Sequence, residues 1–361
     1  MNPINLADFE ALARERLTPL AWDYFAGGAE DEYTVAENCA AFRRIKLRPR
    51  VLADVATHDL ATEVLGQLIS LPVLLAPTSH QRLAHPDAEL ATARGAAAAG
   101  TIAVLGSGNH YSVEEVAAAV NHPFWFQMYC YESRAVTERM IRRAEEAGCR
   151  ALVITADATF PPRRERHIRN GFALPPDVEL RNLLGVGLQD HLLRDENGGM
   201  PAFIASLRNL LLTWDEIDWI RRITETPLVL KGVMTAEDAA LAVEHGVDGI
   251  IVSNHGGRQV DGTLATIQAL PEIAERVGGR IEILLDGGIR RGTDVLKALA
   301  LGAKAVLIGR PYLWGLAMGG EAGVLQVIEL LRAEIDCAMA QCGQADVKRI
   351  SRSLVRLSAE L

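Results

Sequence analysis

The chain has 361 residues, of which 49% are hydrophobic and 23% are charged, and its formal net charge is -9 at pH 7. This composition is typical of a globular protein with a large core and argues against disorder. A negatively charged chain offers no basic field to a phosphate backbone or to anionic lipid. We therefore expect small-molecule partners, no nucleic acid and no membrane.

The five cysteines are scattered and show no spacing typical of a zinc site, so we expect reduced thiols and no metal. The first residues, MNPINLADFEALARERL, include acidic side chains early and lack a cationic stretch before an apolar one, which argues against a signal peptide. No apolar run approaches the roughly 20 residues of a membrane span. These features favour a cytoplasmic protein.

Residues 1–70 are predicted to form a helical segment that packs on the rest of the chain, with INLADFEALARERL and TPLAWDYFAGGA as helices. From residue 71 onward, short apolar runs alternate with longer amphipathic runs, the pattern of βα units around a parallel sheet. Continuous apolar runs are typical of strands buried on both faces. The predicted strands are residues 71–78, 101–106, 124–129, 151–157, 227–232, 249–254, 282–288 and 305–310.

The segments between these strands, such as AVTERMIRRAEEAG and GTDVLKALALG, have apolar residues at three-to-four spacing and glycine near the end, as surface helices do. An open doubly wound sheet would lead from its first strand into a GxGxxG turn. The nearest match, Gly106-Ser107-Gly108, lacks the third glycine. The sequence therefore predicts an α/β fold in which residues 71–361 form a (β/α)8 TIM barrel.

One insertion interrupts this alternation. Between the predicted strands at 151–157 and 227–232 lies a long stretch rich in proline, glycine and asparagine. Long segments of this kind inside a compact domain are usually lids or disordered. We expect the part around residues 171–213 to cover the active site.

Polar residues stand at the ends of the predicted strands, where a barrel of this kind carries its chemistry. A single threonine or serine there is more often a helix cap than a ligand, and Asp157, Asp286 and Lys231 have similar alternative readings. Convergence of such residues from most of the strands favours one shared site. The candidates are Thr78, Ser79, Gln127, Tyr129, Thr155, Asp157, Lys231, Ser253, His255, Arg258, Asp286, Gly288, Arg290, Gly309 and Arg310.

The last two strands lead into glycine-rich turns, DGGIRRGTD and IGRP. Free backbone N–H groups at a helix start favour an anion, and Arg290 and Arg310 supply positive charge. Loops after the seventh and eighth strands are the usual phosphate site of this fold. The alternative is that these turns need glycine only for a positive φ angle.

The run SNHGGRQVDG combines a base with a cation. His255 closely follows a strand, and the planar guanidinium of Arg258 is suited to clamp a carboxylate. A lone histidine is more often structural than catalytic. Here Lys231 on the neighbouring strand completes a base, a carboxylate binder and a buried cation, which favours catalysis.

These motifs resemble the FMN-dependent 2-hydroxy acid oxidase family, which includes glycolate oxidase, lactate oxidase and mandelate dehydrogenase. The resemblance covers nearly the whole chain. The residues and motifs on which the resemblance rests are Tyr24 in WDYFAGGA, then APT, FQMY, TAD followed by RRE, LVLKG, SNHGGRQ, LLDGGIRRGTD, KALALGA and IGRP. The combination of SNHGGRQ with DGGIRRGTD is highly specific.

The resemblance implies FMN as the cofactor. Lys231 would lie against the N1/O2 edge of the flavin, where a cation favours negative charge on the ring and hence substrate oxidation. Asp286 would bind the ribityl hydroxyls. The other implied cofactor contacts are Pro77, Thr78, Ser79, Gln127 and Thr155 at the flavin ring, Gly288, Arg290, Gly309 and Arg310 at the phosphate, and Ser253.

The resemblance also implies substrate roles. His255 would take either the hydroxyl proton or the α-proton of the substrate, and Asp157 would orient His255 and stabilise its imidazolium. Tyr129 would bind the substrate hydroxyl. Arg258 and Tyr24 would bind the carboxylate, with Arg164 supporting Asp157 or the substrate from the lid side.

The chain departs from the family pattern near the expected substrate pocket. LGSGNHYS places Gly106 and Gly108 where the family often has a bulky residue, and APTSHQ replaces APTAMQ-like sequences with Ser79 and His80. We expect the glycines to open the pocket to a longer or aromatic side chain, unless His110 or Tyr111 refills it. His80 is expected to be a packed rim residue.

The function expected from the resemblance is oxidation of an (S)-2-hydroxy acid, with L-lactate favoured and oxygen as the electron acceptor. Glycolate, longer aliphatic acids and mandelate remain alternatives. Within the family, a dehydrogenase with another acceptor remains open. Outside it, a non-catalytic flavin-binding scaffold is disfavoured because it needs no such set of rim residues. A homotetramer or larger assembly is implied by the resemblance.

Overall fold

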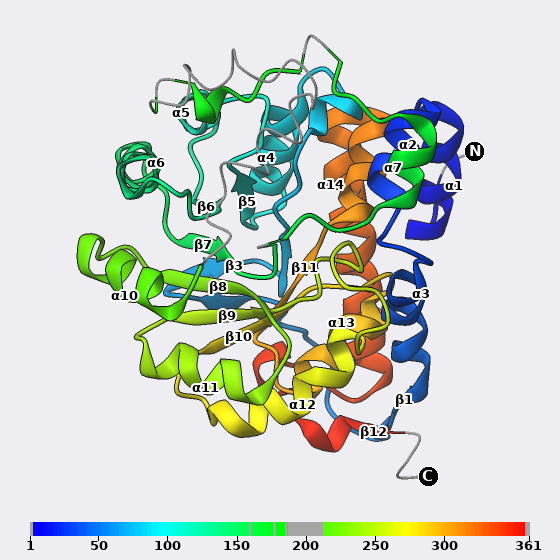
Figure 1. Ribbon diagram of the computed structural model, residues 1–361. Helices are drawn as coiled ribbons and strands as arrows, with labels where there is room; N and C mark the ends of the chain where they lie inside the picture. The colour runs from blue at the N-terminus through cyan, green and yellow to red at the C-terminus, as the bar shows by residue number, and fades with distance from the viewer. Residues whose placement is uncertain (1–2, 159, 176–177, 185, 187–211, 358–361) are drawn as a thin grey trace.

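The computed structural model describes all residues except 1–2, 159, 176–177, 185, 187–211 and 358–361. Eight parallel strands close into a barrel in the order β10-β11-β4-β5-β6-β7-β8-β9 (Figure 1). The strands are β4 (Val73–Leu75), β5 (Ala103–Gly106), β6 (Phe124–Met128), β7 (Leu152–Thr155), β8 (Leu228–Val233), β9 (Gly249–Val252), β10 (Glu282–Leu285) and β11 (Ala305–Ile308). The predicted TIM barrel is confirmed, and each strand lies within or almost within its predicted range.

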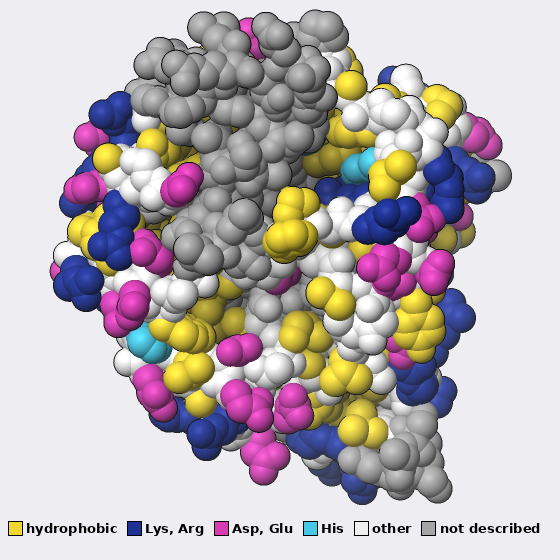
Figure 2. Space-filling model, in the orientation of Figure 1, with side chains coloured by type: hydrophobic (Ala, Val, Ile, Leu, Met, Phe, Trp, Pro, Cys, Tyr) yellow, Lys and Arg dark blue, Asp and Glu magenta, His cyan; other side chains and the backbone are white. Residues whose placement is uncertain are grey.

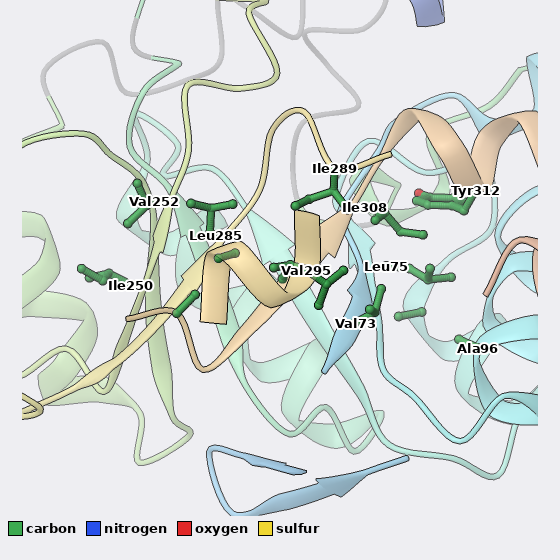
Figure 3. Close-up of a cluster of buried hydrophobic side chains, with 14 of the residues drawn as sticks. Val73, Leu75, Ala96, Ile250, Val252, Leu285, Ile289, Val295, Ile308 and Tyr312 are labelled. Atoms are coloured by element: carbon green, nitrogen blue, oxygen red, sulfur yellow. The ribbon is translucent and has the colours of Figure 1, made fainter. Parts of the chain in front are cut away.

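The strands are apolar along their whole length because both of their faces are buried. Successive side chains of a strand point to opposite faces of the sheet. Leu74, Leu284 and Leu307 belong to the cluster that fills the barrel interior. Their neighbours Leu75 and Leu285 point outward into the cluster that the surrounding helices share, part of which is shown in Figure 3.

The surrounding helices follow the strands in turn (Figure 1). Their ends carry ordinary signals: Ser112 caps one helix in a reciprocal capping box with Glu115, and Pro311 stands in the first turn of another. The helices are α4 (Ala88–Ala98), α5 (Val113–Ala119), α6 (Arg134–Glu146), α10 (Trp214–Ile223), α11 (Ala236–Glu244), α12 (Thr266–Val277), α13 (Gly292–Ala300) and α14 (Arg310–Gln341).

The two helices predicted near the N-terminus are present as α1 (Leu6–Arg16) and α2 (Pro19–Ala26), and α3 (Tyr33–Ala40) follows. The rest of residues 1–70 departs from the expected helical segment. Here β1 (Ile45–Leu47) pairs with β12 (Val355–Leu357), and β2 (Thr62–Val64) forms a hairpin with β3 (Gln67–Ile69). These strands have only three residues each, which is too short for an alternation of apolar and polar side chains to be recognised in the sequence.

The β2–β3 hairpin closes the N-terminal end of the barrel. Val64 and Ile69 belong to the cluster that fills the barrel interior. The backbone N–H of Leu65 donates to Glu282 at the start of β10 over 2.9 Å, and Trp125 Nε1 on β6 donates to Gln67 Oε1 over 3.1 Å. The opposite end, where the strands finish, is left for the functional site.

The insertion between β7 and β8 contains α7 (Glu165–Asn170) and the short 3-10 turn Arg181–Leu183. Most of the predicted lid, residues 171–213, lies outside the described residues. None of the helices in the described part of the chain combines the length and the apolar character needed to cross a bilayer. On the face in Figure 2, basic and acidic side chains are interspersed.

Candidate active site

A cavity of about 900 Å³ opens at the C-terminal ends of the strands. Nearly all the residues singled out from the sequence line it, although they come from α2, most of the barrel strands and the segment before α7. These residues are Tyr24, Pro77, Thr78, Ser79, Gln127, Tyr129, Thr155, Arg164, Lys231, His255, Arg258, Asp286, Gly288, Arg290, Gly309 and Arg310. The predicted residues Asp157 and Ser253 are not among the lining residues and lie directly behind them.

His255 stands in a turn that points its ring at Asp157. Its φ angle of 57° is in the left-handed region, and Gly256 and Gly257 continue in that conformation at 64° and 75°. The Nδ1 atom of His255 lies 2.9 Å from Oδ1 of Asp157, and Gln259 Nε2 donates to the Asp157 carbonyl over 2.8 Å. This arrangement fixes the ring and leaves Nε2 as the nitrogen available for proton transfer.

The charges of this pair are shaped by opposing effects. Burial lowers the pKa of His255 and outweighs the nearby Asp157 carboxylate, so the pKa stays below its ordinary value. Burial alone would raise the pKa of Asp157, but His255 and then Lys231 lower it on balance. The pair therefore rests as a neutral imidazole beside a carboxylate, which is the state that a general base requires.

Lys231 is a buried cation held from two sides. Its Nζ lies 3.1 Å from Asp286 Oδ2 and donates to Ser253 Oγ over 2.8 Å. Burial opposes the charge, but Asp286 and Asp157 raise the pKa of Lys231 above its ordinary value, so the side chain is an ammonium. Ser253 also accepts the backbone N–H of His255 over 3.1 Å. Ser253 therefore lies behind Lys231 and His255, and its direct contact with the cofactor stays a prediction.

The strand ends around β10 and β11 fit the polar tail of FMN. Asp286 Oδ1 is buried with no hydrogen-bond partner among the described residues, so it is ready to accept from a ligand hydroxyl. Gly287 and Gly288 have φ angles of 95° and 84°. A Cβ at Gly288 would lie 2.0 Å from the Asn38 carbonyl oxygen, so only glycine fits where α3 meets this turn.

Arg310 and Arg290 supply the positive charge beside these turns. Arg310 donates to the carbonyls of Phe25, Gly27 and Gly256, each over 2.9 Å. These partners are neutral, and no carboxylate within the described residues forms an ion pair with Arg310. Burial and then the charge of Arg290 lower the pKa of Arg310 to about 10, so it remains a cation at neutral pH. An un-neutralised guanidinium suits a phosphate.

Arg258 is a second buried guanidinium of the cavity, and it shares the Gly27 carbonyl with Arg310. Arg258 Nη1 donates to the carbonyls of Tyr24 and Gly27, each over 2.7 Å, and its guanidinium lies 5.2 Å from the centre of the Tyr24 ring. Arg164 Nε donates to the Arg258 carbonyl over 3.3 Å. Burial, the largest influence, lowers the pKa of Arg258 to about 10 and leaves it charged at neutral pH.

The structure corrects the expectation that Gly106 and Gly108 open the pocket. Neither glycine lines the cavity. A Cβ at Gly108 would lie 2.7 Å from Ser79 Oγ, and one at Gly106 would lie 3.1 Å from Asn109 Oδ1. Neighbouring polar side chains therefore occupy the space that the glycines leave. His80 lies where it was expected, packed at the rim, but it also lines the cavity.

Several residues that the sequence analysis did not single out complete the site. Tyr312 hydrogen-bonds the Thr78 hydroxyl and donates to the Ala76 carbonyl over 2.9 Å, which fixes the loop after β4. His167 and Phe172 line the cavity beside Tyr24. No local signal marks these residues, because their contacts join segments that are far apart in the chain.

The chain matches the model of one protein family, described as FMN-dependent dehydrogenase, over residues 13–357. It is 49% identical to an L-lactate oxidase of Nostoc sp. over 361 residues, covering 99% of each chain. It is 48% identical to a glycolate oxidase of Spinacia oleracea over 353 residues, covering 98% of this chain and 95% of that protein.

Solved structures agree with these relatives. A mandelate oxidase with 2-hydroxy-phenylacetamide superposes with a TM-score of 0.89 at 39% identity, covering 99% of each chain. An oxidized active mutant of (S)-mandelate dehydrogenase superposes with a TM-score of 0.92 at 37% identity, covering 99% of this chain and 100% of that one. The fold, the pocket and the match over nearly the whole sequence place this chain in the FMN-dependent dehydrogenase family.

Proposed function

We propose that the protein is an FMN-dependent oxidase that converts an (S)-2-hydroxy acid, L-lactate in preference, to the 2-oxo acid and passes the electrons to oxygen, forming hydrogen peroxide. One observation carries the proposal: the His255–Asp157 pair and the carboxylate clamp of Arg258 and Tyr24 line or back the same cavity as the buried Lys231. The named L-lactate oxidase and glycolate oxidase relatives support it.

In the proposed reaction, the charged and the neutral residues of the site have different roles. Arg258 and Tyr24 hold the substrate carboxylate, which fixes the orientation of the α-carbon. His255, neutral at rest, accepts the hydroxyl proton or the α-proton at Nε2. Asp157 then faces a newly charged imidazolium at 2.9 Å and stabilises it. Tyr129, which also lines the cavity, donates to the oxygen on which charge changes.

The remaining residues of the cavity are the candidates for binding the cofactor. FMN, when bound, supplies the acceptor for the two electrons that leave the substrate. Lys231 places a positive charge beside the ring, and Asp286 accepts from the ribityl hydroxyls. Pro77, Thr78, Ser79, Gln127 and Thr155 would surround the ring, and Gly288, Arg290, Gly309 and Arg310 would hold the phosphate; all nine line the cavity.

A larger substrate is the second candidate. The described part of the β7–β8 insertion adds apolar side chains to the cavity wall, namely Pro161, Pro162, Phe172 and Leu174. Such a wall accommodates an aliphatic or aromatic 2-hydroxy acid as well as lactate. The mandelate oxidase and mandelate dehydrogenase structures support this alternative.

We also propose that the protein is cytoplasmic and forms a homotetramer or a larger assembly. Val51 and Leu52 are 85% and 102% exposed, and an interface between subunits would cover these two adjacent apolar side chains. The five free cysteines support the compartment, because unpaired thiols are typical of reducing compartments. Light scattering coupled to gel filtration tests the assembly, and a monomer would refute it.

The decisive experiment is the visible spectrum of the purified holoenzyme, mixed without oxygen with L-lactate, glycolate or (S)-mandelate and then opened to air. We expect L-lactate to bleach the flavin band, and air to restore it rapidly with formation of hydrogen peroxide. Slow return in air would indicate a dehydrogenase with another acceptor. A band that no 2-hydroxy acid bleaches would refute the proposed reaction.

A further inference from the structure

Helix α7 lies against α2 (Figure 1), and both helices contribute residues to the cavity lining, Tyr24 from α2 and His167 from α7. Arg166 forms an ion pair with Glu32 and lies 3.6 Å from Asp23. Asn170 Nδ2 donates to Asp23 over 3.0 Å. These contacts join residues that are 134 and 147 positions apart in the chain, and they fix the face that α7 turns toward Tyr24.

That face carries His167, whose ring stacks on Tyr24. The two ring centres are 5.5 Å apart with an angle of 17° between the planes. Phe172 stacks on both rings, with centres 5.0 Å from Tyr24 and 4.8 Å from His167. Together with the guanidinium of Arg258 at 5.2 Å, these contacts confine the Tyr24 ring to one orientation.

The imidazole of His167 contributes to this stack as a neutral ring and adds no charge to it. Burial, followed by the charges of Arg258 and Arg164, lowers the pKa of His167 to about 4. The ring is therefore neutral at neutral pH and adds no competing cation beside Arg258. Its position at the cavity wall requires a test that separates stacking from direct contact with the substrate.

We propose that His167 is a positioning residue for the substrate carboxylate, acting through the ring of Tyr24. The inference rests on the proposed function, because it takes Tyr24 and Arg258 as the carboxylate binders. With the stack intact, Tyr24 is already oriented when the substrate arrives. Without the stack, the Tyr24 ring must be ordered when the substrate binds. Substrate affinity therefore decreases, whereas the rate of the chemical step is unchanged.

The test compares the wild-type holoenzyme with His167→Ala and His167→Phe. His245→Ala is the matched control, because His245 stacks on Trp214 at 4.9 Å and 16° on the outer helices, away from the cavity. KM and kcat are measured with L-lactate. The dissociation constant of pyruvate, which is not turned over, is measured from the change that it causes in the flavin spectrum.

We expect His167→Ala to raise KM and the pyruvate dissociation constant by about threefold to tenfold, the value of one aromatic stack. We expect kcat to stay within about twofold. His167→Phe keeps a stacking ring and should restore both constants, whereas His245→Ala should change neither. Should His167→Ala fail to retain FMN, His167→Asn removes the ring while keeping a polar side chain and takes its place.

Unchanged affinity in His167→Ala would overturn the inference. If His167→Phe bound the substrate as weakly as His167→Ala, the imidazole itself would contact the substrate. A fall in kcat alone would place His167 in the chemical step. Either result would also overturn the inference. Failure of the proposed function is distinct, since then no 2-hydroxy acid would bleach the flavin of the wild-type protein.

Discussion

The Nδ1 atom of His255 lies 2.9 Å from Oδ1 of Asp157, although the two residues are 98 positions apart in the chain. The barrel creates this contact, because β7 and β9 both end at the same rim. Gly232 makes the approach possible, since a Cβ there would lie 2.6 Å from the Cβ of Asp157. The catalytic proposal depends on this pair.

Replacing His255 with alanine should leave FMN bound and abolish most turnover. Loss of a general base costs roughly 10²- to 10⁴-fold in rate. Asp157→Asn should lose less, because the base remains but its imidazolium is no longer stabilised by a carboxylate. The measurement is the anaerobic rate of flavin bleaching at saturating L-lactate. Substantial turnover in His255→Ala would remove His255 from the role of base.

The activity should depend on pH through His255. The base works in its neutral form, so kcat/KM should fall as the pH drops through the pKa of His255, which burial holds below its ordinary value. The Asp157 carboxylate raises that pKa, so Asp157→Asn should shift the fall to still lower pH. Profiles of kcat/KM for both proteins provide the check. An apparent pKa that rises in Asp157→Asn would contradict the pairing.

Arg258→Lys should weaken substrate binding. The guanidinium already donates to the carbonyls of Tyr24 and Gly27, and one ammonium cannot keep these bonds and also clamp a carboxylate. Loss of a charged hydrogen bond corresponds to about tenfold to a hundredfold in affinity. KM for L-lactate and the pyruvate dissociation constant should both rise. Arg163→Lys, at an exposed arginine paired with Glu165, is the control that should bind normally.

Much of the site was predictable because its residues follow strands directly. His255 and Arg258 share one short motif, and the barrel itself dictates that residues such as Lys231 and Asp286 meet at the rim. Once eight buried strands are recognised, the side chains that follow them are expected at the same end of the barrel. The family match over residues 13–357 agrees with that pattern.

The remainder depends on contacts that no local pattern encodes. Thr78 and Tyr312 hydrogen-bond across 234 positions, and His167 reaches Tyr24 only because α7 is fastened to α2. The space beside Gly108 also depends on such a contact. A missing side chain suggests space, but the neighbouring Ser79 fills that space in the folded protein.

Lys231→Met should lower the reduction potential of the bound flavin. The ammonium is the buried cation of the site, and its removal also leaves Asp286 without its ion-pair partner. A charged hydrogen bond of about 1.5–3 kcal/mol corresponds to about 30–60 mV for a two-electron couple. Potentiometric titration measures the shift. Lys304→Met, at an exposed lysine on the opposite end of the barrel, should leave the potential unchanged, and an equal effect there would contradict the placement of Lys231 at the flavin.

Gly288→Ala should weaken FMN binding through a clash with α3. Gly288 has a φ angle of 84°, and a Cβ there would lie 2.0 Å from the Asn38 carbonyl oxygen, so either the phosphate turn or α3 must move. Gly279→Ala is the control, because Gly279 has a similar φ angle of 75° but open space around it. In each variant the left-handed backbone should lower the free energy of unfolding by about 1–2 kcal/mol. This change is measured as a lower melting temperature of the apoprotein. Only Gly288→Ala should also raise the FMN dissociation constant, measured by quenching of FMN fluorescence. Equal FMN affinity in the two variants would show that the turn after β10 does not hold the phosphate.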